Sequence, residues 1–158
     1  MTLIETNFPT RGEFHIIGRA ERTTNLLESD PITARIPAAW ETFIQDDLTA
    51  FIPHQINPGI LLAIYAEYEG DHAGEYTHII GAEVSRLSAI PAGMVGLTVA
   101  PAHYMVFRAV GEMPDAVFQA WQAVWDYFAQ PSIYQRAYTA DYEHYGDTTG
   151  VSIYVAVR

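Results

Sequence analysis

The chain ends in two strand-like segments, RAYTADYEHY at residues 136–145 and VSIYVAV at residues 151–157. Both are rich in aromatic and β-branched residues, and a glycine-bounded turn separates them, so they predict a pair of strands. Glu143 lies between two tyrosines of the first segment. A carboxylate among aromatic rings on an interior strand is costly to keep charged unless a positive group lies beside it. Glu143 is therefore the first candidate for a functional residue, with Arg136 as the basic residue that could reach it in space.

Two earlier segments have helical periodicity. Apolar side chains recur on one face of residues 36–48, with Thr33 as a candidate cap before them. A wide apolar stripe covers one face of residues 114–128, between two prolines that suit the first turn and the stop of a helix. Each stripe carries a tryptophan, Trp40 in the first segment and Trp121 in the second. We expect both helices to lie on a sheet.

Most of the remaining sequence predicts strands separated by turns. The expected strands cover residues 14–22, 60–67, 76–84, 96–98, 104–110, 136–145 and 151–157. The order of elements repeats once, because a strand, a tryptophan-bearing helix and a strand pair follow one another twice. When Trp40 is aligned with Trp121, the apolar positions of the two helices coincide without a gap. A loose twofold match by coincidence is the alternative.

This repeat predicts an α+β fold of tandem, pseudo-twofold β-α-β-β halves that form one antiparallel sheet with two helices on one face. We expect a single domain, residues 1–158, with a first half at about residues 10–88 and a second at about residues 92–158. A ligand cleft is expected at the seam between the halves. Aromatic residues on the sheet face without helices also need cover, which a ligand could supply.

Composition excludes several classes of function. Nineteen acidic and eight basic residues give a net charge of -11, the wrong sign for contact with phosphates or anionic lipids, so we expect no direct nucleic-acid or membrane partner. The acidity weakly favours cationic small molecules, although most acidic proteins are acidic for solubility alone, and this is the favoured reason on charge alone. There are no cysteines, and the six histidines lack metal-ligand spacing, so no metal or other cofactor is expected. Without a basic leader or a long apolar run, a cytoplasmic protein is expected.

Aromatic residues are more numerous than packing requires, with ten tyrosines, seven phenylalanines and three tryptophans. Tyr154 alternates with the aliphatic residues of its strand and should point away from the aliphatic side. Such rings could line a pocket that attracts a flat cation, with a buried carboxylate as countercharge. The alternatives are that the tyrosines are half-buried sheet residues with their hydroxyls in water, and that the tryptophans belong to the core.

Catalytic motifs are weak. The sequence has no nucleophile elbow, phosphate-binding loop or dinucleotide fingerprint. A glutamate and a tyrosine in an apolar pocket could act as acid and base, since desolvation raises the pKa of a carboxyl group. That pair alone does not establish an enzyme, so enzymatic activity stays open and is not the favoured interpretation.

Several short pieces, in order, resemble one family. They are IPAAW at 36–40, IYAEY at 64–68, YTHIIGAEV at 76–84, IPAG at 90–93, PAHYMVF at 101–107, the helix around 121–125, and residues 136–145. Together they are similar to the gyrase-inhibitor-like effector-binding domain, which also occurs in AraC-type regulators, and above all to its integron-cassette-associated branch. The resemblance covers nearly the whole chain.

The resemblance implies tandem β-α-β-β halves and the binding of bulky, lipophilic, often cationic compounds in an aromatic cleft with a central acid. The central acid of the family matches Glu143 through the D-Y-E-x-Y sequence, its helix tryptophan matches Trp40, and its C-terminal aromatic matches Tyr154. Trp121 of the second helix and two tyrosines on expected strands, Tyr65 and Tyr104, join these residues. The expected ligand-binding set is therefore Glu143, Trp40, Tyr65, Tyr104, Trp121 and Tyr154.

Three hypotheses about function follow. The first is a stand-alone domain that binds amphipathic, cationic, drug-like effectors, with Glu143 as counterion. The second is a hydrolase that detoxifies reactive lipophilic compounds with a pocket glutamate and tyrosine. The third is a protein-interaction module that modulates a regulator or gyrase, as the family name suggests. A homodimer or another protein partner stays open.

Overall fold

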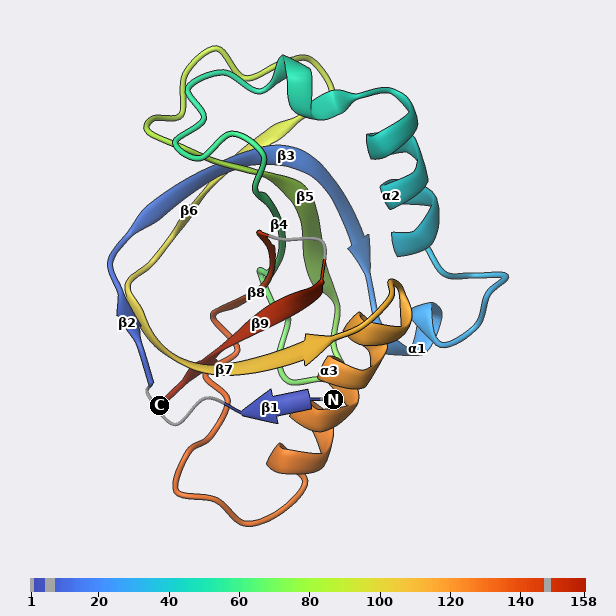
Figure 1. Cartoon of the computed structure of the whole chain (residues 1–158), viewed down its shortest axis with the longest axis vertical. Helices are drawn as coiled ribbons and strands as arrows, with labels where there is room; N and C mark the ends of the chain where they lie inside the picture. Colours follow the sequence, from blue (N-terminus) through green and yellow to red (C-terminus); the bar gives the residue numbers. More distant parts are fainter. Residues whose placement is uncertain (1, 5–7, 147–148) are drawn as a thin grey trace.

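One antiparallel sheet runs through most of the chain in the computed structural model, which describes residues 2–4, 8–146 and 149–158. Its strands in these ranges are β1 (Thr2–Ile4), β2 (Thr10–Arg11), β3 (Phe14–Thr23), β4 (Leu61–Ala66), β5 (Tyr76–Val84), β6 (Val95–Val99), β7 (Ala102–Val110), β8 (Ala140–Tyr145) and β9 (Gly150–Val157). Their order across the sheet is β1-β7-β9-β8-β4-β5-β3-β6, and β2 also pairs with β7. Figure 1 shows that the sheet is strongly curved.

The strand order is symmetric about the pair β4 and β8. Outward from this pair, β5 and β3 follow on one side, while β9 and β7 follow on the other. At the seam, Ala63 of β4 lies opposite Glu143 of β8. The α+β fold predicted from the repeat is thereby confirmed, while the origin of the halves in a duplication stays a prediction.

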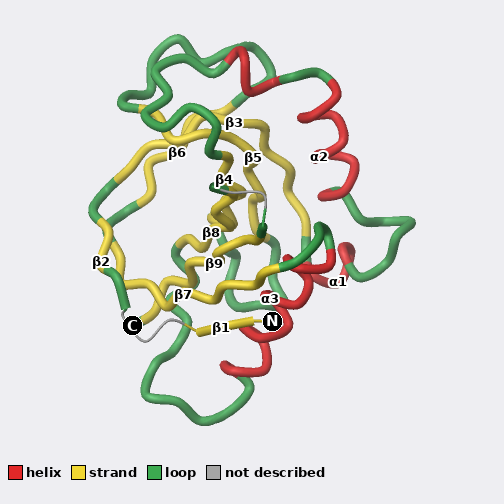
Figure 2. The backbone as a smooth tube through the Cα atoms, in the orientation of Figure 1, coloured by secondary structure: helices red, strands yellow, loops and turns green. Residues whose placement is uncertain are grey.

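Helices lie on the outer side of the curved sheet (Figures 1 and 2). The helical segments are α1 (Asn25–Glu28), α2 (Ile36–Gln45), a 3-10 turn η1 (Leu48–Phe51) and α3 (Asp115–Phe128). The helix α2 packs on β3 and β5, and α3 packs on β7 and β9. No helix in the described ranges combines the length and apolar character that a membrane crossing requires.

The start of α2 differs from the prediction. Thr33 does not cap it, because the Thr33 hydroxyl donates instead to the carbonyl of Leu27. The carboxylate of Glu28 takes the capping role and accepts hydrogen bonds from the backbone N–H groups of Arg35, at 2.9 Å, and Ile36, at 3.0 Å. A negative group at this end also suits the helix dipole. Glu28 lies eight residues before Ile36, so a search for a capping residue next to the helix does not find it.

The strand expected from residue 136 begins only at Ala140. Tyr138 has a φ of 54°, in the left-handed region, so the backbone cannot stay extended through it. Arg136 forms a single isolated bridge with Val157, and its side chain turns toward the start of β8.

Both faces of the sheet are covered. On the helix side, Phe43 of α2 and Val124 of α3 are fully buried against strand residues. On the concave side, the curvature brings the sheet onto itself, so that Phe14 packs edge-on against Tyr142. From the sequence, a ligand could have covered the aromatic residues of this face. In the structure, these residues largely cover one another.

A buried ion pair fixes the loop before β8. Asp141 is completely buried, and its carboxylate accepts hydrogen bonds from Arg136 at 2.7 Å, from the Tyr68 hydroxyl at 2.5 Å and from the Ala156 backbone N–H at 2.8 Å. Each contact joins β8 to a different part of the chain. Removal of one partner from such a cluster leaves a buried charge without compensation.

We therefore expect Asp141→Ala to lower the free energy of unfolding by about 3–5 kcal/mol, because Arg136 would remain buried without its counterion. Urea denaturation monitored by tryptophan fluorescence measures this difference. Asp126→Ala, on the exposed side of α3, is the matched control and should leave stability nearly unchanged. Equal effects of the two substitutions would contradict a stabilising role for the buried cluster.

Candidate ligand cleft

A cavity of about 870 Å³ opens between α2 and α3, above the seam strands β4 and β8. Its walls come from both helices, its floor from the two strands, and part of its rim from α1. This volume lies within the roughly 300–1,000 Å³ typical of small-molecule sites. Its residues include Glu28, Trp40, Leu61, Tyr65, Tyr68, Val117, Phe118, Trp121, Trp125, Arg136, Glu143 and Tyr145.

The local structure explains why large rings face this cavity. Side chains alternate between the faces of a strand, so Tyr65 on β4 and Glu143 on β8 both point to the helix side. In α3 the small residues Ala116 and Ala120 are buried against the sheet, which lets the helix approach closely. Trp121 directly follows Ala120, so its side chain leaves the helix in a different direction, and it lines the cavity.

Glu143 is the centre of a hydrogen-bond cluster. Its Oε2 atom accepts from the Tyr65 hydroxyl at 2.6 Å and from the Trp121 indole N–H at 2.7 Å. Its Oε1 atom accepts from the Tyr145 hydroxyl at 2.5 Å. The residue is only 3% exposed. All three donors are neutral, and within the described part of the chain no arginine or histidine forms an ion pair with this carboxylate.

Burial determines the protonation of this cluster. It raises the pKa of Glu143 above its ordinary value, although the three hydrogen bonds act in the opposite direction. Burial, reinforced by the nearby carboxylate, also raises the pKa values of Tyr65 and Tyr145. The two tyrosines therefore stay protonated and continue to donate, while Glu143 is the group in the cluster whose charge can change.

The basic residue at the cavity is already engaged. Arg136 pairs with Asp141 at 2.7 Å, and its guanidinium carbon lies 4.4 Å from the centroid of the Tyr138 ring. It therefore compensates Asp141 and not Glu143, although Glu143 was the residue that the sequence suggested it could reach. A second carboxylate, Glu28, stands at the rim. The charged groups that line the cavity thus leave a net negative environment.

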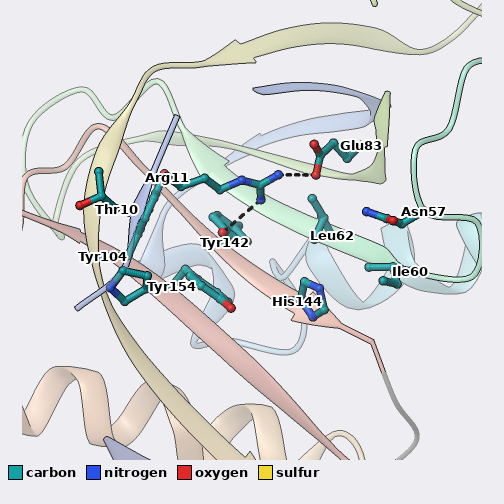
Figure 3. Close-up of a pocket in the computed structure, with 11 residues that line it drawn as sticks. Thr10, Arg11, Asn57, Ile60, Leu62, Glu83, Tyr104, Tyr142, His144 and Tyr154 are labelled. Atoms are coloured by element: carbon teal, nitrogen blue, oxygen red, sulfur yellow. Dashed lines mark hydrogen bonds and ion pairs between the residues drawn. The ribbon is translucent and has the colours of Figure 1, made fainter. Parts of the chain in front are cut away.

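Four of the predicted site residues come together here, namely Glu143, Trp40, Tyr65 and Trp121. Tyr104 and Tyr154 do not join them. Both lie on the concave face of the sheet, where they line a separate pocket with Tyr142 (Figure 3). As the alternation in β9 predicts, Tyr154 points to the opposite face from the aliphatic residues of the strand. Those aliphatic residues face α3, on the side of the cavity, so Tyr154 lies on the concave face.

Sequence reasoning also missed residues that the structure adds. Tyr145 bonds directly to Glu143 and contacts Trp40 edge-on, with ring centroids 5.3 Å apart. Its position two residues after Glu143 on one strand is the signal that could have identified it. Trp125 lines the cavity one helical turn after Trp121, and this spacing was visible as well. Glu28 gave no comparable signal.

Comparison with known proteins decides the family. The model of the family described as "integron-associated effector binding protein" matches residues 9–157. The chain belongs to this family. The integron cassette protein VCH_CASS2, from the mobile metagenome of Vibrio cholerae, is 34% identical, with a TM-score of 0.83 and 99% of each chain covered.

Two further relatives extend the comparison. The structure of SAV2435 bound to tetraphenylphosphonium has a TM-score of 0.77 at 22% identity, with 98% of this chain and 94% of that one covered. The regulator-like protein YobU of Bacillus subtilis (strain 168) is 26% identical over 148 residues, or 89% of this chain and 90% of YobU. The family resemblance inferred from the short sequence pieces is thereby confirmed.

The raised pKa of Glu143 predicts that the free energy of unfolding of the ligand-free protein depends on pH. The protonated carboxyl group of Glu143 contributes to the stability of the folded protein. This contribution is fully present below the unfolded-state pKa of about 4.3 and is lost as pH rises through the higher folded-state pKa. Glu143→Gln cannot ionise, so its melting temperature should exceed that of the wild type at pH 7–8. The difference should disappear near pH 4. Each kcal/mol corresponds to roughly 2–4 °C in a chain of this size.

Thermal unfolding across this pH range, without ligand, measures the effect. Glu112→Gln changes the same net charge at an exposed position and should follow the wild type at every pH. A Glu143→Gln variant that is less stable than the wild type at neutral pH would show that the three hydrogen bonds outweigh the desolvation.

Proposed function

We propose that the cavity between α2 and α3 binds amphipathic small molecules that carry a positive charge, with Glu143 as the counterion. The bound compound would act as an effector, in keeping with the family. Trp40, Tyr65 and Trp121 would form the aromatic wall on which its apolar groups pack, and Tyr145 joins them as a donor to Glu143.

The observation that carries this proposal is the buried carboxylate without a cation. All eight basic residues of the chain are arginines, and the one that lines this cavity is held by Asp141. Among the described residues, the partners of ionised Glu143 are therefore the neutral donors Tyr65, Trp121 and Tyr145. A cationic ligand would supply the missing charge beside a carboxylate that is almost fully buried, where the attraction is stronger than at the surface.

The shape and composition of the walls support the same ligand class. Three tryptophans and several tyrosines line the cavity, so a flat or bulky apolar group would be buried on several sides. Aromatic faces also attract cations, by about 0.5–2 kcal/mol for each favourable contact. Tetraphenylphosphonium, the compound named with SAV2435, combines a lipophilic surface with one delocalised charge. That relative supports the choice of this compound as the first probe.

Glu143→Gln should weaken tetraphenylphosphonium binding by about 30-fold or more, since loss of one partner in a buried charge pair costs about 2 kcal/mol at least. Triphenylphosphine oxide presents similar phenyl rings without a charge, and its affinity should change less than about threefold. Quenching of the cavity tryptophans, or calorimetry, measures both dissociation constants. Asp126→Asn, on the exposed side of α3, is the control for net charge. Equal losses for the two compounds would reject the countercharge role.

Affinity for the permanent cation should also depend on pH. Because burial raises the pKa of Glu143, the wild type should lose affinity as pH falls through that pKa and the carboxyl group becomes neutral. The loss should approach tenfold for each pH unit below it and then level off near the affinity of Glu143→Gln. In Glu143→Gln the affinity should be nearly independent of pH over the same range. A wild-type curve as flat as that of the variant would exclude an ionised Glu143 as the binding group.

The hydrolase alternative rests on one observation, the direct bonds from Tyr65 and Tyr145 to Glu143. These contacts would suit a carboxylate that activates water beside a tyrosine acid. Turnover of a reactive lipophilic ester that Glu143→Gln abolishes, with retention of triphenylphosphine oxide binding, would favour that activity over passive binding.

A further inference from the structure

A second pocket, of about 320 Å³, lies on the concave face of the sheet, opposite the helices (Figure 3). Its lining comes from β2, β4, β5, β7, β8 and β9, together with the segment before β4. Figure 3 shows Arg11 extended across it toward Glu83, with Tyr142 beneath the guanidinium. Tyr104 and Tyr154, which the sequence assigned to the first cavity, belong to this one.

The arginine in this pocket is held in place on several sides. The short strand β2 is fastened to β7 by the pairing of Thr10 with His103, whose side chains also hydrogen-bond at 2.8 Å. The Arg11 guanidinium carbon lies 3.7 Å from the centroid of the Phe14 ring. One N–H donates to the Tyr142 hydroxyl at 3.2 Å, and another pairs with Glu83. A side chain ordered in this way loses little entropy when it binds a ligand.

Hydrogen-bond donors remain unused at this pocket. A guanidinium has five N–H donors, and the described contacts of Arg11 use those directed to Tyr142 and Glu83. Tyr104 is 1% exposed, yet its hydroxyl has no hydrogen-bond partner among the described residues. Burial raises the pKa values of Tyr104 and Tyr142, to about 12 for Tyr142, so both hydroxyls stay protonated. Because Tyr104 lines the pocket, an acceptor on a ligand could take a hydrogen bond from this hydroxyl.

The charges and rings limit the ligand class. Arg11 and Glu83 neutralise each other, so the pocket does not attract a lipophilic cation as the first cavity does. Tyr142 and Tyr154 stack face to face, with ring centroids 4.6 Å apart and planes 7° from parallel, and the stacked pair forms an aromatic part of the pocket lining. The volume is well under half that of the cavity between the helices.

We propose that this pocket is a second binding site, for small flat aromatic molecules with a planar carbonyl acceptor, a carboxamide or a carboxylate. The ring packs against the stacked pair of Tyr142 and Tyr154, and the carbonyl oxygen accepts from Arg11 and from the Tyr104 hydroxyl. This site is independent of the effector cavity, because it lies on the other face of the sheet and shares no lining residue with it.

Three probes of nearly equal shape test the proposal: benzamide, benzoate and benzamidinium. All three tryptophans line the first cavity, so their indole N–H signals in a ¹H–¹⁵N spectrum report on that cavity, whereas the backbone amide signals of Arg11, Tyr104 and Tyr142 report on the second pocket. Benzamide and benzoate should shift these backbone signals and leave the indole signals in place. Benzamidinium, which has donors only, should bind the second pocket at least tenfold more weakly.

Tyr104→Phe removes only the hydroxyl and should weaken benzamide binding about fivefold to tenfold, with tetraphenylphosphonium binding unchanged. Arg11→Gln should weaken benzoate more than benzamide. If Arg11 is only a structural clamp between β2 and β5, none of the probes moves the pocket signals and the proposal fails. Equal binding of benzamidinium, or no effect of Tyr104→Phe, would also overturn it. The indole signals report separately whether the first cavity binds cations.

Discussion

The carboxylate of Glu143 and its three neutral donors are the interaction on which the site depends. The donors come from both sides of the seam, because Tyr65 belongs to β4, whereas Trp121 and Tyr145 belong to the second half of the sheet and its helix. The cluster can form only when the two halves share the β4–β8 pair. The pairing of β4 with β8 joins the two halves of the sheet. The same pairing places Glu143 and its donors together at the floor of the cavity between the helices.

Strand β8 serves both faces of the sheet. Asp141, Glu143 and Tyr145 point to the helix side, while Tyr142 and His144 line the concave pocket. Because side chains alternate along a strand, a shift of the β4–β8 register by one residue would exchange these sets. The buried pair of Asp141 with Arg136, and the hydrogen bond from Ala156 to Asp141, oppose such a shift. The correct register is therefore a condition for both pockets.

The sequence predicted what depends on periodicity and local chemistry. Alternation and helical spacing identified most strands and both long helices, and the isolation of Glu143 among rings identified the central acid. The placement of Tyr104 and Tyr154 could not be predicted in this way, because the face on which a residue acts depends on which side the helices cover and how the sheet curves. Strand β2 has only two residues, which is too short for an alternating pattern of apolar and polar side chains. The sequence therefore did not indicate that Arg11 lines a pocket.

Asp141 and Glu143 differ in how the fold compensates their charge. They lie two residues apart on the same face of β8, and both are buried. Asp141 has an arginine, a tyrosine and a backbone N–H as partners, so its charge is compensated within the fold. Glu143 has three neutral donors and, in the part of the chain that the structure describes, no cation beside it, and its burial raises its pKa. A fold selected for stability alone would gain little from a second buried acid without a counterion. Such an acid, at the floor of an aromatic cavity and with no cation beside it among the described residues, is the group that the proposed cationic ligand would complement.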